Sequence, residues 1–480
     1  MSIYYSNFNT IEYFNFNTTE AEIIDLNLDN IFCKNGHNSN DQSYSNNSIV
    51  KKITLRGGNP EKIISIGNNF LNKCKKLEDI VVAKFGKVTS ICNGFLSNCI
   101  KLKMVKFCDY NLIYPNLTSV GNDFLSNCPN LKSINLLQVL NLTTIGDGFL
   151  SDCTNLTSLD ISYFTNITTI GNNFLSDCTN LASLDISYFT NVTTIGNNFL
   201  SDCTNLTSLN TSNLKNLASI GYGFLSDCAN LTSLDISHFT NVTTIGNNFL
   251  KGCTNLTSLN TFPFTNVTSI GDGFLHYCVN LTSLDTSGFT NVTSIGDGFL
   301  SGCNFKSLDT SPFTNVTSIG NDFLDQCDNL TSLDTSHFTN VTSIESNFLS
   351  RCTNLTSLDT IHFINVKTVG SCFLWNCPNL TLLNISHMLN IDYFWESLSL
   401  GDGDEGYYIN KTIDISWFTF DDDKDRRRWM TDGCINLITL ITINENLREI
   451  IKSFKKISIV YKNEHCVFEN INNDDENNDK

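Results

Sequence analysis

Nineteen cysteines give this 480-residue chain its widest choice of chemistry, because a thiol can form a disulfide, bind zinc or act as a nucleophile. In a small secreted domain, so many cysteines would indicate a disulfide framework. Most of them, however, recur at a fixed step. Seven stand 25 residues apart, and each follows a phenylalanine by four residues: Cys153, Cys178, Cys203, Cys228, Cys253, Cys278 and Cys303. The spacing indicates one structural position used many times.

Three interpretations of this cysteine column are open: a small buried hydrophobe beside its phenylalanine, a series of disulfides, or a metal ladder. Stacked thiols point in parallel, whereas zinc needs ligands that converge from different directions and a disulfide needs side chains that turn toward one another. Packing is therefore the favoured interpretation. We predict no metal and no cofactor.

A column of aspartates is the main candidate for binding. Its seven members, called here the acidic stripe, are Asp160, Asp185, Asp235, Asp285, Asp309, Asp334 and Asp359, with asparagine at the same position in other units. Like charges stacked along a sheet repel unless something offsets them. The stripe is therefore either a site for a basic protein partner or divalent cations, or a solvated face relieved by asparagines and hydroxyls.

Two further columns carry polar groups. Threonines at an inward position, from Thr261 to Thr360, must bond to each other or to the backbone if they are buried. His337, His362 and His387 follow one another in consecutive units, but the same position elsewhere holds Tyr163 and Gly288, which favours a tolerant turn over a metal site.

No catalytic constellation stands out. The segment 401–406, GDGDEG, matches a dinucleotide-binding pattern in form, but its three acidic residues would repel a phosphate. A P-loop, an HExxH motif, a nucleophile elbow and a zinc-spaced pair of CxxC motifs are all missing from the sequence. We therefore predict that the protein is not an enzyme.

The repeat must position all of these columns. In the unit 155–178, alternation over 158–162 places Leu159 and Ile161 inward on a short strand. Ile167 and Ile170 supply apolar anchors on the return path, and a short helical turn then places Phe174 and Cys178 on one face. Each unit exposes an apolar side that only the next unit can cover, so the units must stack.

The pattern I-G-x-x-F-L-x-x-C-x-x-L-x-x-L resembles the BspA-like leucine-rich repeats, although that family's unit is usually slightly shorter than 25 residues. The resemblance implies a leucine-rich-repeat solenoid with a parallel β-sheet on its concave face and short helical turns and loops on its convex face. That family includes bacterial and protist surface proteins that bind host or matrix proteins, so the resemblance also implies a binding role.

The chain divides into five segments by composition. Residues 51–389 hold thirteen units, from Phe70/Cys74 to Phe373/Cys377. We expect a partly disordered N-terminal leader or cap over 1–50 and an insertion loop over 390–412. A degenerate repeat and C-terminal cap over 413–462 and an acidic, disordered tail over 463–480 complete the chain.

The charge is unevenly distributed. The net charge is −18, which argues against nucleic acid as a partner. Residues 51–107 nevertheless carry twelve basic and three acidic side chains, a local +9 that leaves −27 for the remainder. This asymmetry can steer a partner or align copies of the chain head to tail.

No apolar run reaches the roughly 20 residues of a membrane span, and the first residues do not read as a secretory signal. We therefore expect no membrane insertion, a cytoplasmic location and unmodified N-x-S/T sequons, with the cell surface or extracellular space as the alternative. The leading hypothesis is a non-enzymatic protein–protein interaction scaffold. The alternatives are a BspA-like adhesin and a self-assembling structural repeat protein.

Overall fold

The computed structural model describes residues 51–56, 65–83, 88–108, 116–135, 139–380 and 382–384, together with short strands at 2–5, 10–15, 23–27, 412–414, 439–441 and 458–460. The predicted tail, nearly all of the insertion loop, His387 and the 401–406 segment lie outside these residues, as do most of the predicted leader and C-terminal cap. Within the described residues there is no helix with the length and apolarity that a membrane span requires.

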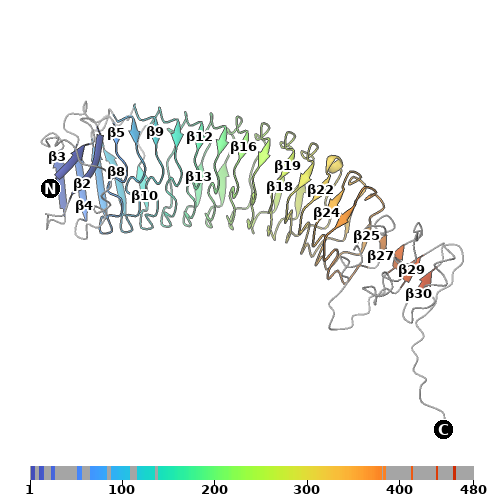
Figure 1. Cartoon of the computed structure of the whole chain (residues 1–480). Coiled ribbons are helices and arrows are strands. Elements are labelled where there is room, and N and C mark those ends of the chain that lie inside the picture. Colours follow the sequence, from blue (N-terminus) through green and yellow to red (C-terminus); the bar gives the residue numbers. More distant parts are fainter. Residues whose placement is uncertain are drawn as a thin grey trace, which may run out of the picture. The chain divides into compact units, whose positions relative to one another are not determined.

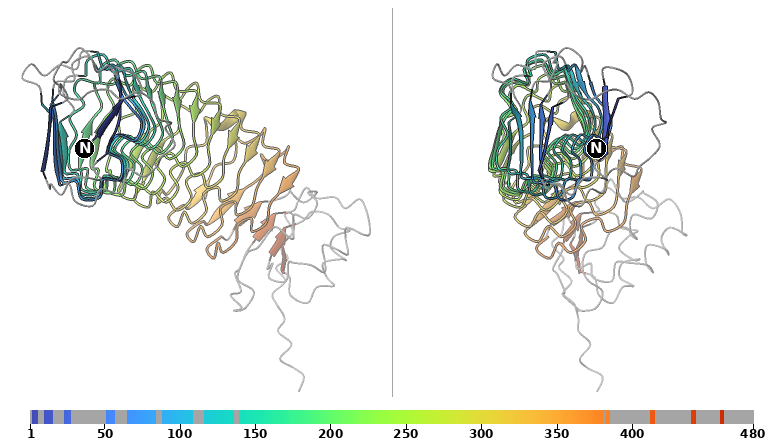
Figure 2. Two further views of the ribbon diagram at one scale, coloured as in Figure 1. Left: turned by 60° about the vertical axis from the view of Figure 1, so that its left-hand side comes forward. Right: turned by 90° about the vertical axis from the view of Figure 1, so that its left-hand side faces the viewer.

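The chain forms two compact units. Unit 1 comprises residues 1–267 and 278–280, and unit 2 comprises residues 268–277 and 281–480. Each unit is a stack of the 25-residue repeats. The end-on view in Figure 2 shows the successive repeats of unit 1 following the same path.

The most regular sheet, here the isoleucine sheet, is built from two-residue strands that precede the I-G glycine position. In unit 1 these strands pair in parallel and in register, so that Thr144 faces Thr169 and Ile145 faces Ile170. They are β5 (Ser65–Ile66), β7 (Ser90–Ile91), β9 (Ser119–Val120), β11 (Thr144–Ile145), β12 (Thr169–Ile170), β14 (Thr194–Ile195), β16 (Ser219–Ile220) and β17 (Thr244–Ile245). At its beginning, β2 (Thr10–Asn15) joins β5 in parallel and β1 (Ser2–Tyr5) joins β2 antiparallel. Unit 2 repeats the arrangement with β19 (Ser269–Ile270), β21 (Ser294–Ile295), β22 (Ser318–Ile319), β24 (Ser343–Ile344) and β26 (Thr368–Val369).

The predicted parallel sheet of L-x-L strands, here the leucine sheet, is also present. In unit 1 it contains β3 (Ile23–Asn27), β4 (Lys52–Arg56), β6 (Asp79–Ala83), β8 (Met104–Cys108) and β10 (Ser133–Asn135), then the pair β13 (Ser183–Asp185) and β15 (Ser208–Asn210), and β18 (Ser258–Asn260). In unit 2 it contains β20 (Ser283–Asp285), then β23 (Ser332–Leu333), β25 (Ser357–Asp359), β27 (Leu382–Asn384), β28 (Thr412–Asp414), β29 (Thr439–Ile441) and β30 (Ser458–Val460). Figure 1 shows β10, β13 and β18 in one row and β9, β12 and β16 in another.

The sequence predicted one sheet in the repeat, whereas the structure contains two. The leucine sheet is interrupted, and the predicted strand over 158–162 of the example unit is not formed. The isoleucine sheet instead passes through what was taken to be an irregular return path. Its isoleucines are buried while the preceding Thr or Ser faces outward, which is the alternation expected of a short strand.

The expected short helical turn around Phe174 is not a helix. Among the described residues the only helix is the 3-10 segment η3 (Phe313–Asn315). In the F-L-x-x-C turn, every second residue is left-handed, with φ of 55° at Asn173, 55° at Leu175 and 58° at Asp177. Alternating hands turn successive N–H groups to opposite sides, so these groups bond to neighbouring repeats: Leu175 N–H donates to Phe149 O at 2.9 Å and Asp177 N–H to Ser201 O at 2.9 Å.

The core is a ladder of phenylalanines. The rings of Phe149 and Phe174 stack with centroids 5.4 Å apart and planes 6° apart, and Phe174 and Phe199 repeat this at 5.3 Å. A second phenylalanine, Phe164, meets Phe149 edge-on at 6.2 Å. Aromatic pairs favour such geometries and bury large apolar areas. The ladder fixes the repeat register on which every surface column depends.

Candidate functional site

The cysteine column is confirmed as packing. Cys178 and Cys203 are fully buried, and their thiols donate to the carbonyl oxygens of Leu150 and Leu175 in the preceding repeat, each at 3.2 Å. The cysteines described by the structure are free thiols. Burial raises the pKa of Cys203 to about 12, so this thiol is protonated near neutral pH and is a poor nucleophile.

No metal site accompanies these thiols in the part of the chain that the structure describes, since no three His, Cys, Asp or Glu side chains gather there as ligands. His337 and His362 occupy the same position in successive repeats, as the sequence indicated.

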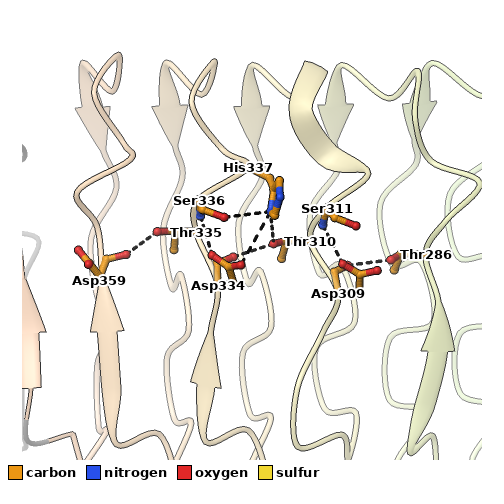
Figure 3. Close-up of polar contacts among 9 residues, drawn as sticks. All are labelled: Thr286, Asp309, Thr310, Ser311, Asp334, Thr335, Ser336, His337 and Asp359. Carbon is orange, nitrogen blue, oxygen red and sulfur yellow. Dashed lines mark hydrogen bonds and ion pairs between the residues drawn. The ribbon is translucent and has the colours of Figure 1, made fainter.

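All seven residues of the acidic stripe are exposed, three of them in unit 1 and four in unit 2. Each uses its Oδ1 atom to accept the backbone N–H of the residue two positions later, at 2.8 to 3.0 Å. Asn210 and Asn260 accept the same bond in their repeats. The turn therefore orients each exposed carboxylate. Figure 3 shows this arrangement for Asp309 with Ser311 and for Asp334 with Ser336.

Inward threonines form hydrogen bonds to the backbone of stripe residues. Thr286 and Thr310 are buried, and their hydroxyls donate to the backbone oxygens of Asp309 and Asp334 in the next repeat, each at 2.7 Å. Thr335 bonds in the same way to Asp359 (Figure 3). The prediction that buried threonines bond to the backbone is confirmed. In unit 2 these bonds join the stripe positions of neighbouring repeats.

Hydrogen bonding favours the ionised form of two stripe aspartates, Asp235 and Asp334. The backbone N–H of Ser336, followed by its hydroxyl, lowers the pKa of Asp334, and His337 and His362 contribute further. The His337 Nδ1 atom lies 3.9 Å from Asp334 Oδ2 and contacts Thr310 and Ser336. In unit 1, Ser237 lowers the pKa of Asp235 in the same order of causes. These two carboxylates are therefore negatively charged at neutral pH.

The first repeats have the opposite character. On β8, Lys106 occupies the stripe position, because it pairs in register with Asn135 of β10. Lys103 forms an ion pair with Glu78 at 2.7 Å, and Lys52 forms one with Asp79 at 3.0 Å. The stripe position thus holds Thr54 on β4, Val81 on β6 and Lys106 on β8, whereas β3 carries Asp25 there.

One group of side chains escaped the sequence-based reasoning. In unit 2, Tyr277, Gln326, Arg351 and Trp375 lie on the F-L-x-x-C turns and are joined through Asp325; we call these five residues the aromatic edge. The signal that could have found them was the departure from the usual Ser-Asp or Ser-Asn dipeptide before the cysteine.

Comparison with known families identifies the family of this chain. The sequence profile of the BspA type leucine rich repeat region matches residues 2–114, 109–216, 185–304 and 268–397. The chain belongs to this family and is a leucine-rich-repeat solenoid protein. Comparison with curated proteins gives no significant match.

Several solved structures are similar to the chain. A leucine-rich repeat protein from Bacteroides ovatus is 19% identical over 71% of this chain and 87% of its own, with a TM-score of 0.45. A leucine rich cell surface protein from Faecalibacterium prausnitzii is 17% identical over 82% and 94%, with a TM-score of 0.41. The functional domain of InlJ from Listeria monocytogenes, described as including a cysteine ladder, is 18% identical over 68% and 74%, with a TM-score of 0.33.

Proposed function

We propose that the protein is a non-enzymatic binding scaffold whose acidic stripe receives a basic segment of a protein partner. The observation that carries this proposal is the Asx bond common to all seven exposed aspartates, which orients each carboxylate through its Oδ1 atom. A side chain fixed before binding loses less conformational entropy when a partner arrives.

Unit 2 offers the most complete version of this surface. Asp285, Asp309, Asp334 and Asp359 occupy the same position in four successive repeats, and strands in a parallel sheet lie roughly 4.8 Å apart. A partner with several lysines or arginines along an extended segment matches this spacing. Electrostatic recognition of this kind mainly raises the association rate and weakens as salt rises.

The test compares two sets of four substitutions that change the charge equally. Asp→Asn at Asp285, Asp309, Asp334 and Asp359 removes the unit 2 stripe, and asparagine keeps the turn bond, as Asn210 and Asn260 show. The matched control places Asp→Asn at Asp152, Asp177, Asp202 and Asp227, a different column in which Asn98 and Asn127 already occur.

Binding of a fluorescent decalysine peptide at low salt is the readout. Exposed ion pairs are worth about 0.2–1 kcal/mol each, so loss of the stripe should weaken binding roughly tenfold while the control set has little effect. Equal weakening by both sets would show a response to net charge alone and would remove the stripe as a site.

A second candidate is an adhesin displayed at the cell surface or secreted, which membership of the BspA-type family favours. Both functions use the same non-enzymatic scaffold and differ in where the protein meets its partner. Locating the protein by surface labelling of intact source cells separates them: a labelled protein supports the adhesin, and a protected one supports the intracellular scaffold.

A further inference from the structure

The aromatic edge is the least repetitive surface of the described chain. Most other repeats place serine followed by aspartate or asparagine before the cysteine; the exceptions are Asn72-Lys73, Lys251-Gly252 and Ser301-Gly302. Four turns of unit 2 instead carry His276-Tyr277, Asp325-Gln326, Ser350-Arg351 and Trp375-Asn376. Tyrosine, tryptophan and arginine are the residue types that dominate binding energy in protein interfaces. The acidic stripe contains none of them.

Tyr277 reaches across a whole repeat to make its contacts. Its ring passes over Gly302, where a Cβ atom would lie 2.5 Å from Tyr277 Cδ1, so that any side chain larger than hydrogen would displace the ring. Beyond this glycine, the Tyr277 hydroxyl accepts a bond from Gln326 Nε2 at 3.4 Å. His276 stacks on the same ring at 4.2 Å.

The network continues to Trp375. Gln326 Nε2 donates to Asp325 Oδ2 at 3.1 Å, and Arg351 binds both oxygens of this buried carboxylate, at 2.5 and 3.1 Å. The Arg351 guanidinium lies 5.7 Å from the centre of the Trp375 ring. The side chains are therefore held in one arrangement, while Tyr277 remains 42% exposed.

The fold does not require this network. In unit 1 the position of Tyr277 and Arg351 is taken by Asp152, Asp177, Asp202 and Asp227, with the same left-handed turn. A structural role alone would be met by the serine and aspartate found there. Four partly exposed side chains linked through the buried Asp325, all dispensable for the repeat, indicate a surface built for contact.

The charge around the edge favours a basic partner. Residues 268–380 hold ten acidic and three basic side chains, and Arg351 is neutralised by Asp325. The first described F-L-x-x-C turn of unit 1 and the two residues after it carry the complementary positive charge. Lys73, Lys75 and Lys76 are exposed there. Within the described residues, none of these lysines has a carboxylate at ion-pair distance. A lysine ammonium is attracted both to acidic side chains and to the face of a tyrosine or tryptophan ring.

We propose that the aromatic edge of one copy of the chain binds the lysine turn, Lys73, Lys75 and Lys76, of a second copy. The contact joins different surfaces and is therefore heterologous, the type that builds head-to-tail assemblies or closed rings. It goes beyond the proposed scaffold function, because it uses other residues and another partner.

Two variants test the proposal, each built from residues that other repeats hold at the same positions. The edge variant carries Tyr277→Asn and Trp375→Ser, which follow Asn98 and Ser350. The lysine variant carries Lys73→Asn, Lys75→Thr and Lys76→Asn, which follow Asn98, Thr154 and Asn155. Both preserve the turn, and thermal unfolding checks that both fold.

Sedimentation velocity at low salt is the readout, with protein concentrations up to roughly 1 mM, the range of a weak complex. The unaltered chain should associate, with assembly weakening as salt rises, and each variant alone should be monomeric. An equal mixture of the two variants should form a one-to-one dimer, because one supplies the lysines and the other the edge.

A monomeric unaltered chain would overturn the proposal. So would either variant associating as well as the unaltered chain, or a mixture that stays monomeric. The decalysine assay substitutes none of these residues, so failure of the assembly and failure of the acidic-stripe proposal are distinguishable.

Discussion

A cysteine thiol in this protein both fills space and donates a hydrogen bond. Cys203 lies beside the phenylalanine ladder and donates to Leu175 O, 28 positions earlier in the chain. Cys178 and Cys228 make the same bond to the leucine 28 positions before each of them. Because burial raises the pKa of these thiols, they resist both ionisation and oxidation.

These thiols predict a loss of stability in alkali. A thiol titrates near pH 8.5 when unfolded, whereas Cys203 titrates near 12 when folded, so the unfolded chain releases its protons first. The contribution of these thiols to stability should be constant below about pH 8 and fall as pH rises through 9 and 10, by up to about 1.4 kcal/mol per pH unit for each thiol. Urea midpoints measured at pH 7, 9 and 10 check this. A flat profile would contradict the burial of the column.

The Arg351–Asp325 pair predicts a strong single-substitution effect. Arg351→Asn removes two of the three hydrogen bonds to the buried Asp325 carboxylate, which should cost about 2 kcal/mol of unfolding free energy. The double variant Asp325→Ser with Arg351→Asn places at each position a residue that another repeat holds there, Ser97 and Asn98 respectively, and should recover most of that loss. Chemical denaturation of the single and double variants measures this coupling. An equal loss in both would mean that the pair is not the cause.

At the scale of the element, the alternating turn explains why a helix-like sequence forms no helix. Its left-handed residues would cost energy in isolation, since non-glycine residues rarely adopt positive φ. Here the N–H groups of Leu175 and Asp177 bond to repeats on either side. The turn is therefore stable only inside a stack.

The same turn brings like charges together. Burial and then the charge of Asp202 raise the pKa of both Asp177 and Asp227. A carboxyl with a raised pKa favours folding below its unfolded pKa and loses that contribution as pH rises. Asp202→Asn should therefore stabilise the protein at pH 7 by about 0.5 kcal/mol, and the gain should disappear near pH 3. Thermal melts at the two pH values check it, with Asp160→Asn, at an exposed stripe position, as the control.

At the scale of the whole molecule, asparagine columns hold neighbouring repeats together. The side-chain amide of Asn191 donates to Thr165 O at 2.9 Å, and Asn266 and Asn340 make the same bond to the preceding repeat. These asparagines belong to N-x-S/T sequons. A glycan on such an amide would remove a bond between repeats.

Glycosylation therefore offers a test of where the protein folds. We expect material from its native source to carry no N-glycans, because modification at these positions opposes stacking. Intact mass before and after glycosidase treatment measures this. Heavy glycosylation of a folded protein would contradict the intracellular expectation and would favour the adhesin.

The sequence by itself determined the repeat, its register and its buried columns. A 25-residue period with phenylalanine, cysteine and leucine at fixed positions leaves stacking as the way to bury those side chains. The outward acidic column and the inward threonines followed from the same alternation. Whether the stripe binds a partner remains a proposal, because the period places the charges without identifying their ligand.

Only the tertiary structure decided the hand of the turns, the isoleucine sheet and the aromatic edge. Each depends on bonds between residues about 25 to 50 positions apart, such as Leu175 to Phe149 or Tyr277 to Gln326. The helix or strand propensity of a short segment does not predict such bonds. Considered alone, the F-L-x-x-C segment suits a helical turn. Stacking supplied the partners that made another conformation favourable.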